Sequence, residues 1–341
     1  MAATLATRAR RSPIRYGLGV VCGLLVVALL VANLVGYARF LAFSAALDAA
    51  LAAESSGRTV ECAWSFPFQE SRCMVSVEVD EAELVAADRV PTSAIFGSDG
   101  WLRERYVAEV VGAQADSPVV ERLVTEFRRI RAERSLDSDE YLELMVAAVQ
   151  AIPYGDPDEE TMLAAEVLVQ GRGVCTDKSL LLASLLAHEG YETVLWVFPT
   201  QRHVALGVAS DGANFRGTRY AFVETTTPAF VGQASPEYRA AGPVVLPPSQ
   251  VDLGGSRSYG SGEQVEVILA ELRRLQVVSL TADGYDAYAR TSIQHRERYA
   301  ARAMEQWIAD AMATFILTHT HDRAGVHSLL TASPPLPTLR S

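Results

Sequence analysis

The 341-residue sequence has little lysine, little cysteine and a deficit of positive charge. Lys178 is its only lysine, and 30 basic residues against 41 acidic ones give a net charge of −11. Proteins that bind nucleic acid by neutralising its phosphates usually show the opposite balance, so we expect no nucleic-acid partner. Hydrophobic residues make up 49% of the chain and charged residues 21%, which excludes a disordered or collagen-like protein and indicates a globular one with a sizeable core.

Signatures of several enzyme classes are also missing. The chain contains no CxxC pair and no HExxH motif. His319 and His321 lie only two positions apart near its end, so no metal-ligand spacing supports a metalloenzyme. The glycines at Gly171 and Gly173 are not followed by the Lys-Ser/Thr of a nucleotide-binding loop. We therefore expect no metal and no cofactor.

The run of residues 17–36 carries no charge, whereas four arginines and no acidic residue precede it. Twenty helical residues at about 1.5 Å each span roughly 30 Å, the thickness of the hydrocarbon core of a bilayer. The sequence therefore predicts a basic stub over residues 1–16 and a transmembrane helix over residues 17–37.

The arginine-rich end also sets the expected orientation. The positive-inside rule keeps the stub in the cytoplasm and places everything after about Arg39 outside it, as in a single-pass protein of the cell membrane. Without the four arginines of the stub, 26 basic residues face 41 acidic ones, a net charge of −15. A cleaved signal peptide usually has a shorter apolar region, of about 7–15 residues. Small residues at 43–49 still leave room for a cleavage site, so both an uncleaved anchor and a cleaved one stay open.

The four cysteines fit an extracytoplasmic placement. Cys22 lies in the predicted membrane helix, where a thiol is a small apolar group. Cys62 and Cys73 are eleven positions apart and flank the short strand and turn at 64–68. In an oxidising compartment they can form a disulfide, and two reduced, half-buried thiols are the alternative. Either way, Cys175 has no partner.

The rest of the chain divides by its patterns. Residues 38–115 are predicted to be a strand-rich N-terminal region, with 75–79 and 106–111 as the clearest strands. Two helices follow, over 118–133 with Ser117 as its cap and over 139–152. Residues 231–262 are rich in Gly, Pro and Ser, which indicates a long surface loop. We expect the region 233–330 to contain this loop and C-terminal helices at 264–276 and 285–318. A tail at 331–341 follows.

A cysteine, a histidine and a glutamate stand at the ends of successive predicted elements. Cys175 follows a glycine turn at the start of an apolar helix that runs to residue 188. His203 begins the second strand of a hairpin made by 193–198 and 203–209, and Glu224 ends the next strand, 219–225. A helix N-terminus stabilises a thiolate, a nearby histidine serves as its base, and a carboxylate orients that histidine. This order indicates a nucleophilic Cys175 with His203 and Glu224 as its partners.

Each of these residues has a plainer explanation when taken alone. A single cysteine at a helix start is more often a packed structural residue, and a glutamate at a strand end usually faces solvent. Asp177 lies in the first helical turn, where a carboxylate favours the helix dipole whatever the function. For Lys178, next to it, we expect a solvent-facing side chain. The three residues in this order, with glycines before Cys175 and a helix after it, favour the catalytic interpretation.

The stretch from Tyr154 to Thr227 resembles the transglutaminase-like superfamily, the papain-like cysteine fold of microbial, membrane-anchored transglutaminase-core proteins. Members commonly show a Gly-x-Cys turn, an apolar helix ending in a Gly-Tyr pair, a histidine that begins a strand, and a strand that ends in an acidic residue. The matching segments here are Gly173-Val174-Cys175-Thr176-Asp177, Gly190-Tyr191, His203-Val204-Ala205-Leu206-Gly207-Val208 and Phe222-Val223-Glu224-Thr225-Thr226.

The resemblance implies an α+β fold with a transglutaminase-like core over residues 116–232, in which the helix bearing the cysteine packs on an antiparallel sheet. It places Cys175 in the nucleophile position, His203 in that of the base, and Glu224 where many relatives carry Asp. The implied reaction is acyl transfer from a protein, peptide or cell-envelope amide through a thioester. Hydrolysis and protein cross-linking both stay open, as does a non-catalytic extracytoplasmic binding or scaffold module. Only the Cys175 amide is identified as an oxyanion donor.

Overall fold

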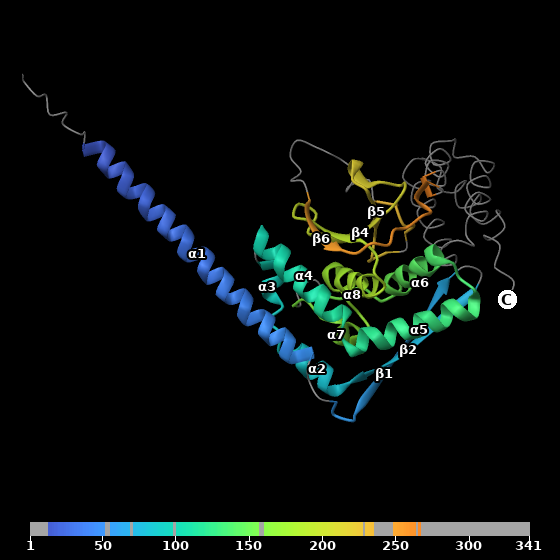
Figure 1. The fold of residues 1–341 in the computed structure, drawn as a ribbon. Helices are drawn as coiled ribbons and strands as arrows, with labels where there is room; N and C mark the ends of the chain where they lie inside the picture. The colour runs from blue at the N-terminus through green and yellow to red at the C-terminus, as the bar shows by residue number, and fades with distance from the viewer. Residues whose placement is uncertain are drawn as a thin grey trace, which may run out of the picture.

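The computed structural model describes residues 13–51, 55–68, 71–97, 100–156, 160–227, 229–234, 248–263 and 265–266. It is an α+β protein in which helices lie between a two-stranded and a four-stranded antiparallel sheet (Figure 1). The predicted stub before residue 13, most of the predicted C-terminal helices and the tail lie outside the described residues.

The N-terminal helix α1, Pro13–Leu51, is a single helix of 39 residues. Among the described residues it is the one helix long and apolar enough to cross a membrane. Its N-terminal half projects away from the other elements (Figure 1), and its C-terminal half packs against them. On that half, Phe40, Phe43 and Leu47 recur at helical spacing and are buried, so one face of α1 belongs to the core.

The first sheet is an antiparallel hairpin of β1, Thr59–Phe68, and β2, Ser71–Asp80. The predicted strand at 75–79 lies within β2. Cys62 pairs with Val77 and Cys73 with Phe66, so the two cysteines lie four residues apart along the ladder. Four residues of strand measure about 13 Å, well beyond the ~7 Å that a disulfide can bridge between Cα atoms. Both thiols are free and buried, which excludes the disulfide alternative.

The rest of the region 38–115 is helical, which corrects its prediction as strand-rich. The helices α2, α3 and α4 span Glu81–Ala87, Ser93–Gly97 and Trp101–Ala115. The predicted strand at 106–111 lies inside α4, where the buried residues are Tyr106, Val107, Val110, Val111, Gln114 and Ala115. Their spacing of one, three and four positions is that of a helix, and it overrides the preference of valine and tyrosine for strands.

Four further helices form the centre of the molecule: α5, Pro118–Arg134, α6, Ser138–Gln150, α7, Ala164–Gln170, and α8, Cys175–His188. The predicted start of α5 is confirmed, with Ser117 Oγ accepting a hydrogen bond from the Val120 amide. The cap of α6 is Asp137, one residue before the predicted Ser138. Residues 177–186 of α8 are buried on every side, which makes α8 the central helix.

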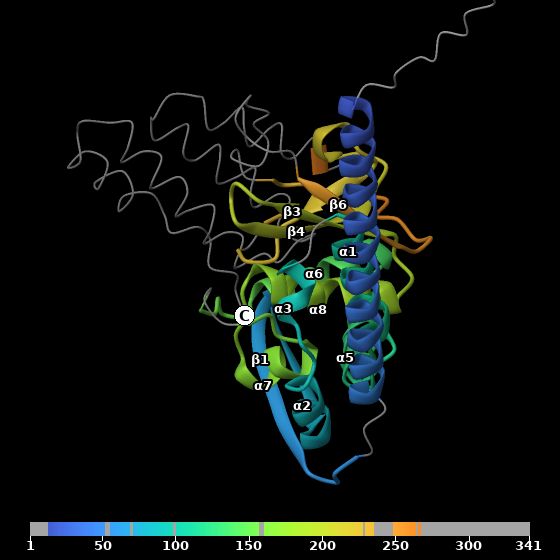
Figure 2. The ribbon, with the colours of Figure 1, turned by 90° about the vertical axis from the view of Figure 1, so that its left-hand side faces the viewer.

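The second sheet has the strand order β5-β4-β3-β6. The bounds are Thr193–Phe198 for β3, His203–Ala209 for β4, Tyr220–Val223 for β5 and Ser249–Gly254 for β6. The predicted hairpin is thus confirmed, whereas β6 lies in a segment predicted to be a surface loop. The helices α4, α6 and α8 separate this sheet from the β1–β2 hairpin (Figures 1 and 2).

The other face of this sheet is covered by a separate aromatic cluster. Trp196 stacks parallel to Phe222 with 5.9 Å between ring centroids, and Phe215 of the short 3₁₀ helix Phe215–Gly217 lies 4.8 Å from Trp196. A Cβ atom at Gly207 would lie 2.6 Å from the Trp196 ring, so β4 accommodates the ring only because glycine is there.

Candidate active site

Cys175 is the first residue of α8 and is 6% exposed. The turn before it is held by a short parallel pairing, in which the Gly155 amide donates to the Gly173 carbonyl (3.2 Å) and the Gly173 amide donates to the Pro153 carbonyl (3.0 Å). A Cβ atom at Gly173 would lie 3.2 Å from the Asp177 Cβ atom. Glycine at this position therefore lets the strand-like turn pass close to the start of α8.

Asp177 stabilises the N-terminus of α8 by hydrogen bonds. Its carboxylate is buried and accepts hydrogen bonds from the backbone amides of Val174 (2.8 Å) and Met162 (3.0 Å). The dipole interaction expected from the sequence is thus accompanied by a tie to the segment before α7. Asp177 thereby fixes the backbone around Cys175.

His203 and Glu224 come from neighbouring antiparallel strands. Leu206 of β4 pairs with Val223 of β5, so the next residue, Glu224, lies diagonally across from His203 on the same face. The distance between His203 Nε2 and Glu224 Oε2 is 3.2 Å. Both side chains are buried. The second oxygen, Oε1, accepts hydrogen bonds from the amides at 225 and 226 and from the Thr226 hydroxyl, so the carboxylate is fixed in direction.

The Cys175 thiol is hydrogen-bonded to the His203 ring, and the backbone amides of Thr176 and Val204 also donate to its sulfur. Burial raises the pKa of the thiol, but these hydrogen bonds and the charge of His203 outweigh burial and hold the pKa below its ordinary value. Burial lowers the pKa of His203, but the contacts with Cys175 and Glu224 outweigh it and raise the pKa to about 9. Both shifts favour a thiolate on Cys175 and an imidazolium on His203.

The three residues singled out in the sequence thus meet in one buried cluster, each at the end of its element. The hydroxyl of Ser179, one helical turn after Cys175, ties these elements together. It donates to the Val204 carbonyl (3.2 Å) and lies 3.1 Å from the Thr225 hydroxyl oxygen. Through Ser179, α8 is fixed to the residues that follow His203 and Glu224. The sequence shows no signal for this role beyond a small polar residue in an apolar helix.

Tyr154 is a member of the site that sequence reasoning missed. It follows α6 and is paired with Gly173 through the backbone, which places its phenol at Cys175. The phenol is hydrogen-bonded to the Cys175 side chain and to its backbone amide. Partial burial and the negative charge of Cys175 raise the pKa of Tyr154. About half of the Tyr154 side chain is exposed, so the phenol reaches the buried thiol from the protein surface, beside the one oxyanion donor that the sequence identified.

Lys178 is wholly buried, which contradicts the predicted solvent-facing side chain. Its ammonium donates to the carbonyls of Ile152 (2.7 Å) and Gln150 (3.1 Å) at the end of α6. Burial lowers the pKa of Lys178 to about 8, opposed by the charge of Glu224. The prediction was wrong because α8 is enclosed on all sides, including its first turn. Lys178 therefore supports the segment that carries Tyr154.

Gln150 connects the same segment to the third residue of the cluster. Its side-chain amide donates to the backbone carbonyls of Glu224 (2.9 Å) and Ala229 (3.0 Å). Lys178 and Gln150 together join the end of α6 to α8 and to the residue that follows β5. In the sequence the contact partners are separated by more than twenty residues, so no local pattern indicates them.

Over the part of the chain that the structure describes, no group of three or more His, Cys, Asp or Glu side chains is arranged to hold a metal ion. The functional groups that meet at the cluster are a thiol, an imidazole and a carboxylate. Comparisons of the chain with protein-family models, curated proteins and solved structures found no match.

Proposed function

We propose that this protein is a membrane-anchored, transglutaminase-like thiol enzyme that transfers acyl groups from amides through Cys175. The observation that carries this proposal is the contact of Cys175 with His203, and of His203 with Glu224 at 3.2 Å, with a lowered thiol pKa and a raised imidazole pKa. A nucleophilic cysteine is activated by a histidine partner of this kind, and groups with shifted pKa values are concentrated at functional sites. A helix bearing the cysteine and packed on the strand bearing the histidine supports the transglutaminase-like assignment.

The proposed reaction uses only groups of this cluster. The thiolate of Cys175 attacks the amide carbonyl carbon, and the Cys175 backbone amide stabilises the oxyanion that forms. His203 then gives its proton to the leaving amine, the C–N bond breaks and a thioester remains. Water or a second amine, deprotonated by His203, attacks the thioester, releases the acid or new amide and restores the thiolate. Glu224 keeps the ring oriented and stabilises its protonated form.

The proposed substrates are amides of proteins, peptides or the cell envelope, and the proposed location is the outer face of the cell membrane. The helix α1 supplies the anchor, with the arginine-rich end of the chain in the cytoplasm. The net charge of −15 beyond the stub disfavours polyanionic substrates. Water as acceptor makes a peptidase or amidase, and a protein amine makes a cross-linking enzyme.

A second candidate function is a non-catalytic binding or scaffold module that keeps the same cluster. The observation in its favour is that Cys175 is 6% exposed and its side chain is hydrogen-bonded to the Tyr154 phenol. In that function the cluster stabilises the fold, and Tyr154 stays in place permanently.

Alkylation of the full chain with iodoacetamide near neutral pH separates the two functions. Mass spectrometry of each cysteine site gives the rate at Cys175, with the buried Cys62 and Cys73 as internal comparators. The enzyme predicts fast labelling at Cys175 that His203→Ala slows to the rate of an ordinary thiol, while Cys175→Ala removes the fast site. Labelling of Cys175 no faster than an ordinary thiol, or unchanged by His203→Ala, overturns the proposal. Incorporation of a fluorescent primary amine into a glutamine-rich protein then distinguishes transfer from hydrolysis.

A further inference from the structure

The helix α1 changes its surroundings at a defined place. Residues 21–35 are exposed on every side, although they are almost all apolar. From Phe40 onward one face is buried against the rest of the protein. A helix that is apolar on every side suits lipid, and a one-sided apolar face suits packing on a soluble domain. Because the helix is unbroken, the boundary between lipid and protein packing falls at about residues 36–39.

The element of the soluble part that lies at this boundary is the start of α4. A Cβ atom at Gly36 would lie 2.8 Å from Leu102 Cδ1, so α1 and α4 are in close contact there. Farther along, Phe40 and Phe43 pack edge-on against Tyr106 with centroid distances of 5.5 and 4.8 Å. Next, the Ser44 hydroxyl is hydrogen-bonded to the Glu109 carboxylate. Contact positions increase together along both helices, so α4 runs parallel to α1 and its N-terminus is the end nearest the boundary.

The side chains at this end are those that favour a membrane surface. Trp101 and Tyr37 are each 41% exposed. The guanidinium carbon of Arg105 lies 5.5 Å from the centre of the Trp101 ring and 5.8 Å from that of Tyr37. Trp and Tyr are enriched at the headgroup level of membranes, where one end of the ring is apolar and the other is wet, and arginine extends its charge toward lipid phosphates.

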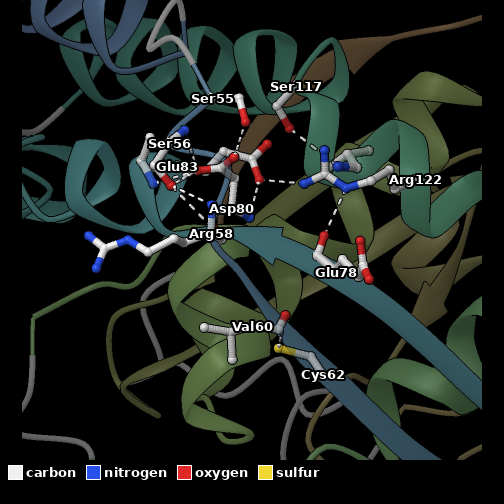
Figure 3. Close-up of polar contacts among 12 residues, drawn as sticks. Ser55, Ser56, Arg58, Val60, Cys62, Glu78, Asp80, Glu83, Ser117 and Arg122 are labelled. Carbon is white, nitrogen blue, oxygen red and sulfur yellow. Dashed lines mark hydrogen bonds and ion pairs between the residues drawn. The ribbon is translucent and has the colours of Figure 1, made fainter.

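The soluble part is also fixed at the far end of α1, so it does not swing on a linker. Figure 3 shows Ser55 and Ser56, which follow α1 closely, directed toward Asp80 at the end of β2. The Ser56 amide and hydroxyl donate to the Asp80 carboxylate at 3.0 and 2.7 Å, and the Ser55 hydroxyl donates to its other oxygen. In the same cluster, Glu83 of α2 pairs with Arg122 of α5 (Figure 3). Contacts along α4 and at Asp80 thus hold α1 at both ends of its packed half.

We propose that one surface beside α1, which we call the α4 edge, lies in the lipid headgroup layer and forms a second membrane contact. It consists of Tyr37, Trp101, Leu102 and Arg105. The occupant of this surface is the bilayer that α1 crosses. This inference rests on the proposed membrane anchoring by α1 and does not depend on the chemistry at Cys175. Since α4 packs directly on α8, whose first residue is the proposed nucleophile, the α4 edge holds the candidate site in one orientation to the membrane.

Fluorescence quenching by brominated lipids tests the α4 edge in the full chain reconstituted into vesicles. The chain has four tryptophans, so the emission of Trp101 is obtained as the difference between wild type and Trp101→Phe. We expect this difference to be quenched strongly by lipids brominated near the headgroup and weakly by aqueous iodide. The matched control is Trp64→Phe, because Trp64 lies on β1 with its indole bonded to the Ala148 carbonyl, and this variant should keep the lipid-quenched component.

The outcomes separate the α4 edge from the proposals on which it rests. One outcome is that the protein resists carbonate extraction from the vesicles while its Trp101 emission is quenched by iodide and not by brominated lipid. This result overturns the proposal for the α4 edge and leaves the proposed anchor standing. Release of the protein by carbonate overturns both the anchor and the edge, whereas the labelling rate of Cys175 reports only on the enzyme. If Trp101→Phe fails to fold, the rate of backbone amide hydrogen exchange at residues 100–106 of the wild-type protein tests the α4 edge instead. We expect slower exchange in vesicles than in detergent, and equal exchange overturns the proposal.

Discussion

His203 Nε2 lies 3.2 Å from Glu224 Oε2, so the carboxylate engages one nitrogen of the imidazole and leaves the other, Nδ1, for the Cys175 thiol. The second oxygen of Glu224 is held by three donors from residues 225 and 226. The direction of the ring is therefore set by the carboxylate, and the carboxylate by the backbone. This arrangement makes each member of the cluster separately testable, because charge, length and position can be changed one at a time.

The first prediction concerns the pH at which Cys175 becomes reactive. Its pKa lies below that of an ordinary thiol because contact with His203 outweighs burial, so wild-type alkylation should stay fast to a lower pH than that of an ordinary thiol. Without His203, burial dominates and raises the pKa, so His203→Ala should shift the midpoint of the rate profile to higher pH. Iodoacetamide rates at Cys175 between pH 5 and about 10 measure this. Profiles with the same midpoint in both proteins would contradict the ion pair.

The second prediction concerns the charge of Glu224. Glu224→Gln keeps the shape but removes the charge that helps to raise the His203 pKa, so the imidazolium is lost at lower pH. Turnover should fall by about 100-fold or more, within the range typical of an acid–base partner. Glu224→Asp keeps the charge on a side chain one methylene shorter and should retain more activity than Glu224→Gln. A smaller loss in Glu224→Gln than in Glu224→Asp would show that length, not charge, is what the site requires.

The third prediction concerns the phenol of Tyr154, which is hydrogen-bonded to the Cys175 side chain and backbone amide. Tyr154→Phe removes the hydroxyl but keeps the ring, so we expect alkylation a few-fold slower near pH 6, where the hydrogen bond favours the thiolate, and unchanged near pH 9. Tyr154→Ala also removes the ring and should raise the alkylation rate at high pH, because solvent then reaches the sulfur. A high-pH rate that stays unchanged in Tyr154→Ala would show that the ring does not cover the thiol.

How far the sequence predicts this molecule depends on whether the signal is local. The bounds of β3 and β4 were predicted to the residue because the tight turn between them separates two strongly apolar strands. The start of α5 was predicted because serine followed by proline is a local capping signal. The strand β6 was missed because only one of its residues, Val251, is buried, and its pairing with β3 joins segments more than fifty residues apart. Its place at the sheet edge is decided by tertiary contacts.

The same distinction applies to the candidate site. Cys175, His203 and Glu224 were singled out because each stands at the end of an element with a recognisable pattern. Tyr154 and Lys178 carried no such signal. Tyr154 reaches Cys175 only because a loop pairs with Gly173, and Lys178 is buried only because the end of α6 packs over the first turn of α8. Residues that support a site through packing between distant segments can be identified only from the structure.

The last prediction follows from Lys178, whose burial lowers its pKa from 10.5 to about 8. Between these values the unfolded chain keeps the proton that the folded protein has lost, so the free energy of unfolding should rise with pH across this window. Full titration corresponds to about 3 kcal/mol. Lys178→Met leaves the carbonyls of Gln150 and Ile152 without their donor, which costs about 1–3 kcal/mol, but it has no such titration.

The stability of wild type relative to Lys178→Met should therefore increase from pH 8 to pH 10.5. Urea unfolding of both proteins in detergent micelles, followed by tryptophan fluorescence, measures this difference. The titration of His203 runs the other way, because its raised pKa stabilises the folded protein below about 6.5 and loses that effect as the pH rises through about 9. His203 is present in both proteins, so its contribution cancels in the difference. Parallel stability curves would show that the Lys178 ammonium stays charged in the folded protein, contrary to the effect of its burial.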